Sequence, residues 1–425
     1  MKPRPWFLVL LWLGLWLWPG IGHGASATPG AEASASSLRV DLVTVGRGTG
    51  LFTRGGHTAL AITETRPDGR VVETVYNYGD TNFEDPLLAW HFVAGDMDFF
   101  VSVAGDLYDV AERYGLLQDR DVVKQRLALS QAQAKTLSDM LELEIQPDNR
   151  TYRFHHLEHL CSTEIRDRLD TLVGGEIQRQ LADTDPWTVR DIQHHTFNAH
   201  PGGTLIGDLF YGRRHDLPID RYYALLMPER MRDDLQTVMV PDPDGGDGLV
   251  PFAGEPEVLA ARGAPPWSDD QSSETWVIAI ALAGVGIVGG FVLARRGTDS
   301  PRSSAAWLVA WSLPIGLGGL GLVLLPLVSS VPELHDNELV VSWLVTDLAL
   351  VPVAVRWWRK GVTAPAWVWR YAQVRLVVVT LAVAARAGGV FIQQPWILPV
   401  ASLGCSLGLW WFVRNLRATA PDAHP

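Results

Sequence analysis

Cysteine is scarce in this sequence, and its scarcity excludes two classes of small module. The 425 residues contain two cysteines, Cys161 and Cys405. That number excludes a scaffold held by several disulfides and a zinc module built on clustered cysteines. Basic residues are also in deficit, with a net charge of −12 and a pI near 5.4. A protein of that charge is not expected to bind nucleic acid.

Charge and tryptophan are distributed unevenly along the chain. Residues 1–275 carry a net charge of −17, whereas residues 276–425 carry +5 and hold eleven of the 18 tryptophans. The mean hydropathy of +0.08 therefore averages two unlike regions. The sequence predicts an acidic domain followed by a Trp-rich apolar one.

The N-terminus has the pattern of a secretory signal. Lys2 and Arg4 precede an apolar run over residues 6–18, and Ala25-Ser26-Ala27 is a plausible cleavage site. We predict a signal peptide over residues 1–25, with an uncleaved anchor as the alternative. Residues 26–37 are small and read as a linker. In either case the segment that follows is exported.

Five apolar stretches predict a membrane domain over residues 276–417. They cover residues 276–294, 305–330, 339–355, 376–393 and 395–413. Basic loops alternate with acidic or uncharged ones, as five spans with an outside N-terminal domain require. The prediction is a multi-pass protein of the cell (inner) membrane with a cytoplasmic tail at 418–425. Asp347 and Arg386 fall inside spans, where ionisable residues are either functional or a bundle-facing pair.

Residues 38–258 predict one α+β domain, tethered to the membrane part by residues 259–275. Alternating apolar residues predict strands at 38–45, 57–63, 71–78 and 99–103, with an extended segment at 152–154. Ser130 and Gln133 form a capping-box pattern that starts a helix over 130–143. A second helix is expected over 161–173, so the only cysteine of this domain stands at a helix N-terminus.

Cys161 is the most informative residue of the domain. Free N–H groups and the helix dipole stabilise a thiolate at a helix N-terminus, and a thiolate is a nucleophile for acyl transfer. The competing interpretation is a buried, inert cysteine. His57, at the start of a strand directly after Gly55-Gly56, is a candidate base. The segment HHLEHLC offers another possibility, a zinc site on His155, His159 and Cys161.

A series of short motifs resembles the Lnb family of membrane proteins. The motifs are GGHTAL around His57, YNYGD at 76–80, RDVVKQRLALS at 120–130, YRF at 152–154 and CSTEIRD at 161–167, with weaker likeness at His335-Asp-Asn337 and Gln393. The order of histidine strand and cysteine helix is similar to circularly permuted papain-like folds of the NlpC and lecithin–retinol acyltransferase kind. The family usually has Asn before the cysteine, where this chain has Leu160.

The resemblance implies a thiol-dependent acyltransferase for lipoprotein N-acylation. Cys161 would carry the acyl chain as a thioester and His57 would act as base. Asn77 would orient His57, with Tyr76 and Tyr78 as rivals on the opposite strand face. The expected partners are membrane lipids and a lipid or lipoprotein substrate in the outer leaflet of the cell membrane, with no cofactor or metal.

Two further residues match family positions, and two other functions stay open. Arg120 and Arg166 are expected to be structural salt-bridge partners first and headgroup contacts second. The same fold would also serve a cysteine peptidase or amidase acting on cell-wall peptides, or a non-enzymatic assembly or signalling module of the envelope.

Overall fold

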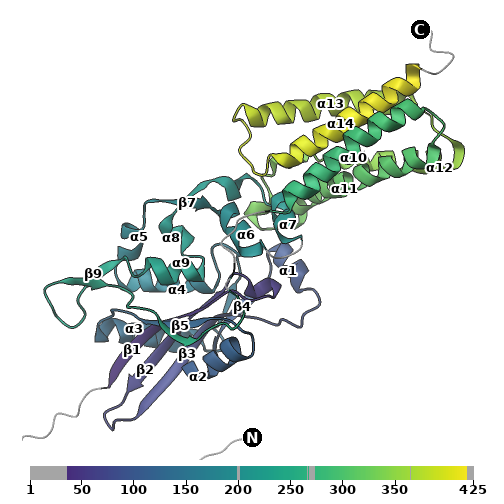
Figure 1. Ribbon diagram of the computed structural model, residues 1–425. Coiled ribbons are helices and arrows are strands. Elements are labelled where there is room, and N and C mark those ends of the chain that lie inside the picture. The colour runs from purple at the N-terminus through teal and green to yellow at the C-terminus, as the bar shows by residue number, and fades with distance from the viewer. Residues whose placement is uncertain (1–35, 199–201, 266, 268–272, 364, 419–425) are drawn as a thin grey trace, which may run out of the picture.

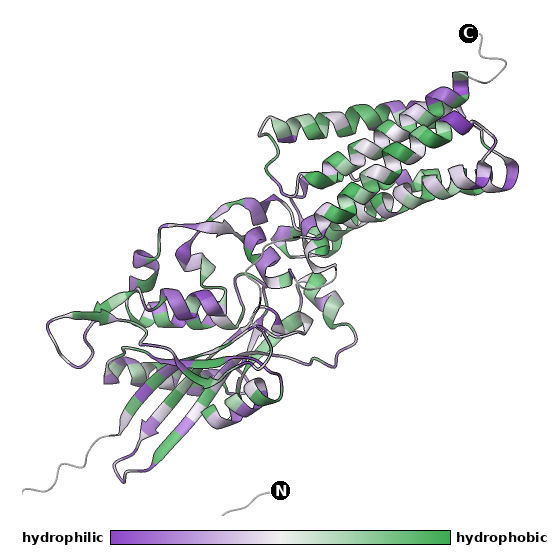
Figure 2. Cartoon of the chain, in the orientation of Figure 1, coloured by the Kyte–Doolittle hydropathy of each residue, from purple (hydrophilic) through white to green (hydrophobic). Residues whose placement is uncertain are grey.

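The computed structural model describes residues 36–198, 202–265, 267, 273–363 and 365–418. The predicted signal peptide, most of the linker and the predicted tail lie outside the described residues. An N-terminal α/β domain is followed by a helical bundle, and the two parts lie end to end (Figure 1). Apolar residues dominate the bundle helices, whereas the N-terminal domain is mixed (Figure 2).

A seven-stranded antiparallel sheet forms the centre of the N-terminal domain, in the order β11-β5-β1-β2-β3-β4-β6. Its strands are β1 (Ser37–Val45), β2 (His57–Thr65), β3 (Val71–Asp80), β4 (Asp98–Val103), β5 (Val122–Arg126), β6 (Thr151–Arg153) and β11 (Glu257–Ala260). The hairpin turn between β2 and β3 lies far from the bundle, so the opposite ends of these strands face it (Figure 1).

Helices cover both faces of the sheet because its side chains alternate between two apolar clusters. One face packs on α3 (Gln131–Glu144) and α4 (Cys161–Leu172), and the other on α2 (Leu107–Val110), which continues into η2 (Ala111–Leu116). Ser130 caps α3 and its backbone N–H bonds Gln133, as the capping-box pattern predicts. The predicted strands and both predicted helices are present.

Smaller elements complete the N-terminal domain. They are η1 (Leu51–Thr53), α1 (Leu88–Ala94), α5 (Glu176–Gln180), α6 (Val189–Phe197), α7 (Gly203–Phe210), η3 (Arg213–Asp216), α8 (Arg221–Ala224) and α9 (Pro228–Asp234), with the ribbons β7 (Thr184–Thr188)–β8 (Pro218–Asp220) and β9 (Met239–Pro241)–β10 (Leu249–Pro251). Strand β11 runs to Ala260, two residues past the predicted domain end at 258, because it completes the sheet beside β5.

The bundle holds four long apolar helices, or five spans if one bent pair is counted as a span. The long helices are α10 (Thr275–Arg296), α11 (Pro301–Val328), α13 (Ala366–Ala387) and α14 (Ile397–Ala418). The predicted span at 339–355 is bent by 59° between residues 341 and 345. Its parts are η4 (Pro332–Leu334), η5 (Glu338–Val341), η6 (Val345–Ala349) and α12 (Leu350–Lys360).

Glycines allow α10 and α14 to pack closely. A Cβ at Gly290 would lie 2.6 Å from the Cα of Gly408, and one at Gly286 would lie 2.7 Å from the Cα of Cys405. Small residues spaced four apart are typical of contacts between helices in membranes. Cys405 lies fully buried at this contact and far along the chain from Cys161, and both thiols are free.

The ionisable residues of the bundle pair differently from the sequence prediction. Asp347 binds Arg375 through two hydrogen bonds of 2.7 and 2.8 Å, and both side chains are fully buried. We expected Arg375 in a loop and Arg386 as the possible partner of Asp347. Helix α13, the third of the four long helices, starts at Ala366 rather than near 376, which brings Arg375 into the bundle, and Arg386 bonds the carbonyl of Phe391.

Buried polar contacts fix the N-terminal domain on the bundle. Asn337 donates to the carbonyls of Leu209 and Phe210 at 2.9 and 3.0 Å, and Gln393 donates to Tyr211 at 3.1 Å. These two bundle residues thereby satisfy the free carbonyls at the end of α7, which a helix end otherwise leaves unpaired. The Lnb-like residues Asn337 and Gln393 are therefore structural at this junction.

Candidate functional site

The first part of the candidate site is a hydrogen-bonded pair on neighbouring strands. The register of β2 and β3 pairs Ala59 with Asn77. His57, two residues before Ala59, therefore projects from the same face as Asn77. His57 Nε2 is hydrogen-bonded to the amide oxygen of Asn77. Of the two ring nitrogens, Nδ1 remains for another partner.

That partner is Cys161, the first residue of α4. The thiol forms a side-chain hydrogen bond with His57, and its sulfur accepts from the backbone N–H groups of Thr58 and Ser162. Leu160 occupies the N-cap and has no polar side chain with which to cap the helix. The first amides of α4 are therefore left for the sulfur, and the structure brings Cys161, His57 and Asn77 together.

Glycine at position 79 allows a bulge of β3 beside the cysteine. Gly79 adopts φ +90° at a bulge of β3, a backbone conformation that other residues rarely adopt. A Cβ there would lie 3.7 Å from the Cβ of Cys161. The bulge thus interrupts the regular pairing of β3 with β4 at the point where Cys161 lies beside the sheet.

Electrostatics at the site favour the ion pair of thiolate and imidazolium. Burial raises the pKa of the Cys161 thiol, but the charge of His57 and the hydrogen bonds to the sulfur outweigh burial and lower the pKa below its usual value. Burial lowers the pKa of His57, and the charge and hydrogen bond of Cys161, with that of Asn77, raise it above its usual value. Both residues are of intermediate exposure.

Arg120 and Tyr114 complete the wall behind His57. The Tyr114 ring lies 5.9 Å from the His57 ring, and the Arg120 guanidinium lies 5.3 Å from the Tyr114 ring. Arg120 donates to the carbonyl of Gly46 and to Gln118 but forms no ion pair in the described part of the chain. Burial lowers the pKa of Arg120 to about 10, and the nearby Tyr114 and Cys161 oppose that shift.

The two arginines singled out in the sequence therefore differ. Arg166 forms the expected salt bridge, with Asp167 at 2.7 Å, and stacks on Tyr222. The expected salt bridge of Arg120 is wrong for the described residues, because its environment is built from carbonyls, an aromatic ring and the thiol. The sequence did not predict that Tyr114 lies beside His57, because no local motif includes this residue.

The other candidates lie elsewhere. Tyr76 and Tyr78 project from the opposite face of β3 and donate to Glu142 and Glu144, so they do not contact His57. His159 bonds Glu164 at 2.8 Å. The set His155, His159 and Cys161 is not gathered as a metal site, because the ligand atoms that converge in the described residues belong to a different group.

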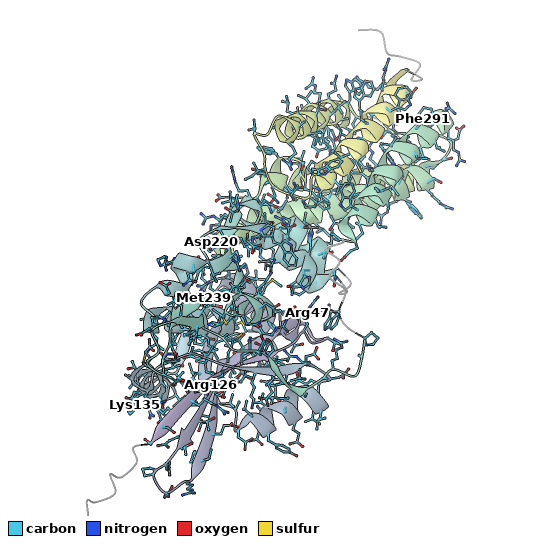
Figure 3. The ribbon with its side chains drawn as sticks, turned by 60° about the vertical axis from the view of Figure 1, so that its left-hand side comes forward. Arg47, Arg126, Lys135, Asp220, Met239 and Phe291 are labelled. Carbon is cyan, nitrogen blue, oxygen red and sulfur yellow. The ribbon has the colours of Figure 1, made fainter. Side chains whose placement is uncertain are left out.

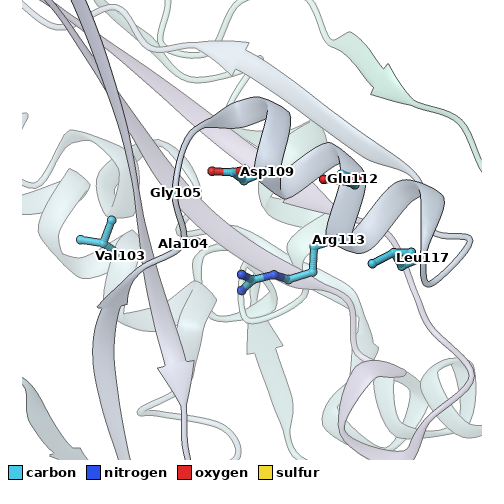
Figure 4. A pocket seen from close by; sticks show the side chains of 7 residues that line it. All are labelled: Val103, Ala104, Gly105, Asp109, Glu112, Arg113 and Leu117. Carbon is cyan, nitrogen blue, oxygen red and sulfur yellow. The ribbon is translucent and has the colours of Figure 1, made fainter.

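A separate cavity lies behind η2 and does not include the site. Its volume is about 360 Å³, and it is lined by Val103, Ala104, Gly105, Asp109, Glu112, Arg113 and Leu117 (Figure 4). Its polar lining comes from the exposed side of α2 and η2. No predicted site residue faces it.

Comparison with known families bears on this domain. Residues 28–195 match the family model described as Lnb N-terminal periplasmic domain. This segment contains His57, Asn77 and Cys161 and is followed by the apolar helices, which supports a membrane protein of the Lnb family with a periplasmic domain. The predicted resemblance is confirmed. Neither the curated proteins nor the solved structures give a significant match.

Proposed function

We propose that the periplasmic domain is a Cys–His acyltransferase that moves an acyl chain from a lipid ester to the N-terminal amine of a lipoprotein. The observation that carries the proposal is the contact of the Cys161 thiol with His57, which Asn77 holds from its other ring nitrogen. The order of histidine strand and cysteine helix also fits a circularly permuted papain-like fold. We further propose a multi-pass protein of the inner membrane.

The first half-reaction follows from this geometry. His57 Nδ1 takes the thiol proton, and the Cys161 sulfur attacks the ester carbonyl carbon. The carbon–oxygen bond of the ester breaks, and the leaving alcohol oxygen takes the proton back from His57. A thioester on Cys161 and a lyso-lipid result. The Asn77 oxygen keeps Nε2 protonated throughout, which leaves Nδ1 free for proton transfer.

The second half-reaction restores the thiol. The lipoprotein amine attacks the thioester carbonyl while His57 Nδ1 removes a proton from the nitrogen. The carbon–sulfur bond breaks, and the departing thiolate is stabilised by His57 and by the amides of Thr58 and Ser162. The positive charge of Arg120 near the sulfur favours the same thiolate form.

An apolar rim beside the site supports a lipid substrate. This rim consists of four apolar side chains that are 41–57% exposed, Phe52, Phe83, Leu87 and Trp90. Phe52 precedes His57 and Phe83 follows Gly79, and their rings lie 6.0 Å apart. Exposed aromatic and aliphatic side chains of this kind are costly in water and are favoured at a membrane interface.

The rim adjoins the bundle through α1. The carbonyl of Val93 accepts from the Ser329 hydroxyl, and that of Ala94 accepts from the backbone N–H of Ser330, both residues directly after α11. Helix α1, which carries Trp90, therefore lies at the end of the bundle (Figure 1). A substrate whose ester lies at the leaflet surface would meet Cys161 from this side.

A diacylated lipopeptide with a free N-terminal amine tests the proposal. The full chain, purified in detergent, is expected to shift an acyl chain to the amine and to carry a transient acyl group on Cys161, both detected by mass spectrometry. Cys161→Ala should abolish both, while the matched variant Cys405→Ala retains them. Equal products from wild type and Cys161→Ala would refute the nucleophile. Cleavage of cell-wall peptides, with the lipopeptide unchanged, would favour a peptidase or amidase instead.

A further inference from the structure

Three ligand-type side chains from the two parts of the chain converge at the junction. His155 and His156 lie between β6 and α4, whereas Glu333 lies in η4 after the second long helix of the bundle. His155 Nε2 lies 3.3 Å from Glu333 Oε2, and one ligand atom of each of the three residues lies within 4.8 Å of the others. None of the three takes part in the acyl-transfer chemistry proposed above.

The cluster contains a polar atom that the protein itself does not satisfy. His156 Nε2 is buried and has no hydrogen-bond partner in the described residues, whereas the buried Glu333 Oε2 has the 3.3 Å contact with His155 Nε2. An unsatisfied buried nitrogen or carboxylate oxygen is costly unless another group binds it. The stacked rings of Tyr211 and His215, whose centroids lie 5.2 and 6.0 Å from that of His156, close the other side of the cluster.

We propose that His155, His156 and Glu333 bind one divalent transition-metal ion of the zinc class. Two imidazoles and one carboxylate form a donor set that Zn²⁺ takes in proteins, with a fourth position left for water. Softer, thiolate-preferring ions and the oxygen-preferring Mg²⁺ and Ca²⁺ fit this set less well.

The geometry agrees with such an ion. Metal–ligand bonds of about 2.0–2.1 Å place tetrahedral ligand atoms about 3.3 Å apart. The His155–Glu333 contact already has this spacing. The ligand atoms of the three residues lie within 4.8 Å of one another, so small side-chain rotations would bring the ligand atom of His156 to the same spacing.

An ion at this place would tie the periplasmic domain to the bundle. Its ligands would span the chain from residue 155 to residue 333, beside the contact of Gly212 N–H with the Glu333 carbonyl at 2.7 Å. The histidines precede Cys161 by a few residues, so the ion would also fix the segment that leads into α4. The role is structural and requires no acyl-transfer activity.

Metal binding by the full chain tests this site directly. The protein is purified in detergent without a histidine tag, stripped with a chelator and titrated with Co²⁺, followed by visible absorption, and with Zn²⁺, followed by elemental analysis. We expect one ion per chain. His156→Ala and Glu333→Gln should weaken binding at least about tenfold. His159→Ala, a neighbouring exposed histidine paired with Glu164, should bind like wild type.

Thermal unfolding separates loss of the site from loss of the fold. Zn²⁺ should raise the unfolding temperature of wild type and of His159→Ala, and leave that of Glu333→Gln unchanged, since only a ligand of the native state stabilises it. Absence of a stoichiometric ion in wild type would overturn the proposal. So would equal affinity in wild type and Glu333→Gln, or a loss of binding confined to His159→Ala.

Discussion

Replacing His57 with Gln should change the ionisation of Cys161 in a way that can be measured without a substrate. In the wild type the imidazolium and two backbone N–H groups lower the pKa of the thiol against the opposing effect of burial. Without His57, burial acts against the amides alone, and the pKa should rise to the usual value or above it. An ordinary thiol with a pKa of about 8.5 is about 3% ionised at pH 7. The thiolate fraction at pH 7 should therefore fall from its wild-type level to about 3% or less.

Alkylation by iodoacetamide measures this population, because only the thiolate reacts. The rate for the wild type should rise at a pH below the usual thiol pKa and then level off. The rate for His57→Gln should rise only in the alkaline range. Cys161→Ala supplies the background from Cys405, and His159→Gln is the matched control because that histidine pairs with Glu164. Coincident pH profiles for wild type and His57→Gln would refute the ion pair.

Three other substitutions test the surroundings of the site and the bundle. Asn77→Ala removes the partner of His57 Nε2, a bond of about 1.5–3 kcal/mol to a charged ring, so acyl transfer should slow by about 10- to 150-fold in single-turnover measurements. Gly79→Ala forces φ +90° on a residue with a Cβ, so the free energy of unfolding measured by chemical denaturation should fall by about 1–2 kcal/mol. An unchanged free energy of unfolding would contradict the positive φ at the bulge. Asp347→Asn leaves the buried Arg375 without a charged partner and should lower the stability of the bundle by about 3–5 kcal/mol, measured by thermal unfolding in detergent. The control Arg386→Gln should lower it less.

The parts of the fold that depend on local pattern could be predicted from the sequence. Alternation along β2 and β3, the capping box at Ser130 and the helix that Cys161 begins are properties of short segments, and all are present. The edge strand β11 straddles the predicted domain end at 258, so its last two residues fall in the predicted tether. Only its pairing with β5, more than a hundred residues away, makes it a strand.

The bundle shows the limit of hydropathy as a signal. The stretch 339–355 is apolar enough for a span, yet it is bent by 59° and contains two short 3₁₀ helices. The predicted span at 376–393 leaves Arg375 in the preceding loop, whereas the structure buries Arg375 in the bundle, where Asp347 offsets the cost of its charge with two hydrogen bonds. No sequence spacing indicates that these residues meet. For the site, the sequence indicated Cys161, His57 and Asn77 but not Tyr114.

The junction gives the bundle a role beyond anchoring. Asp208, at the end of α7, accepts hydrogen bonds from Ser273 and Thr275 at the start of α10, and Asn337 holds the last carbonyls of the same helix. Figure 3 shows Arg126 of β5 and Lys135 of α3 at the end of the molecule opposite to Phe291 of α10. With the C-terminal half of α7 held by residues of the bundle, the N-terminal domain cannot turn freely on a flexible tether. The end of the sheet that carries His57 is thus held toward the bundle, which is the orientation that the proposed reaction on a lipid ester would require.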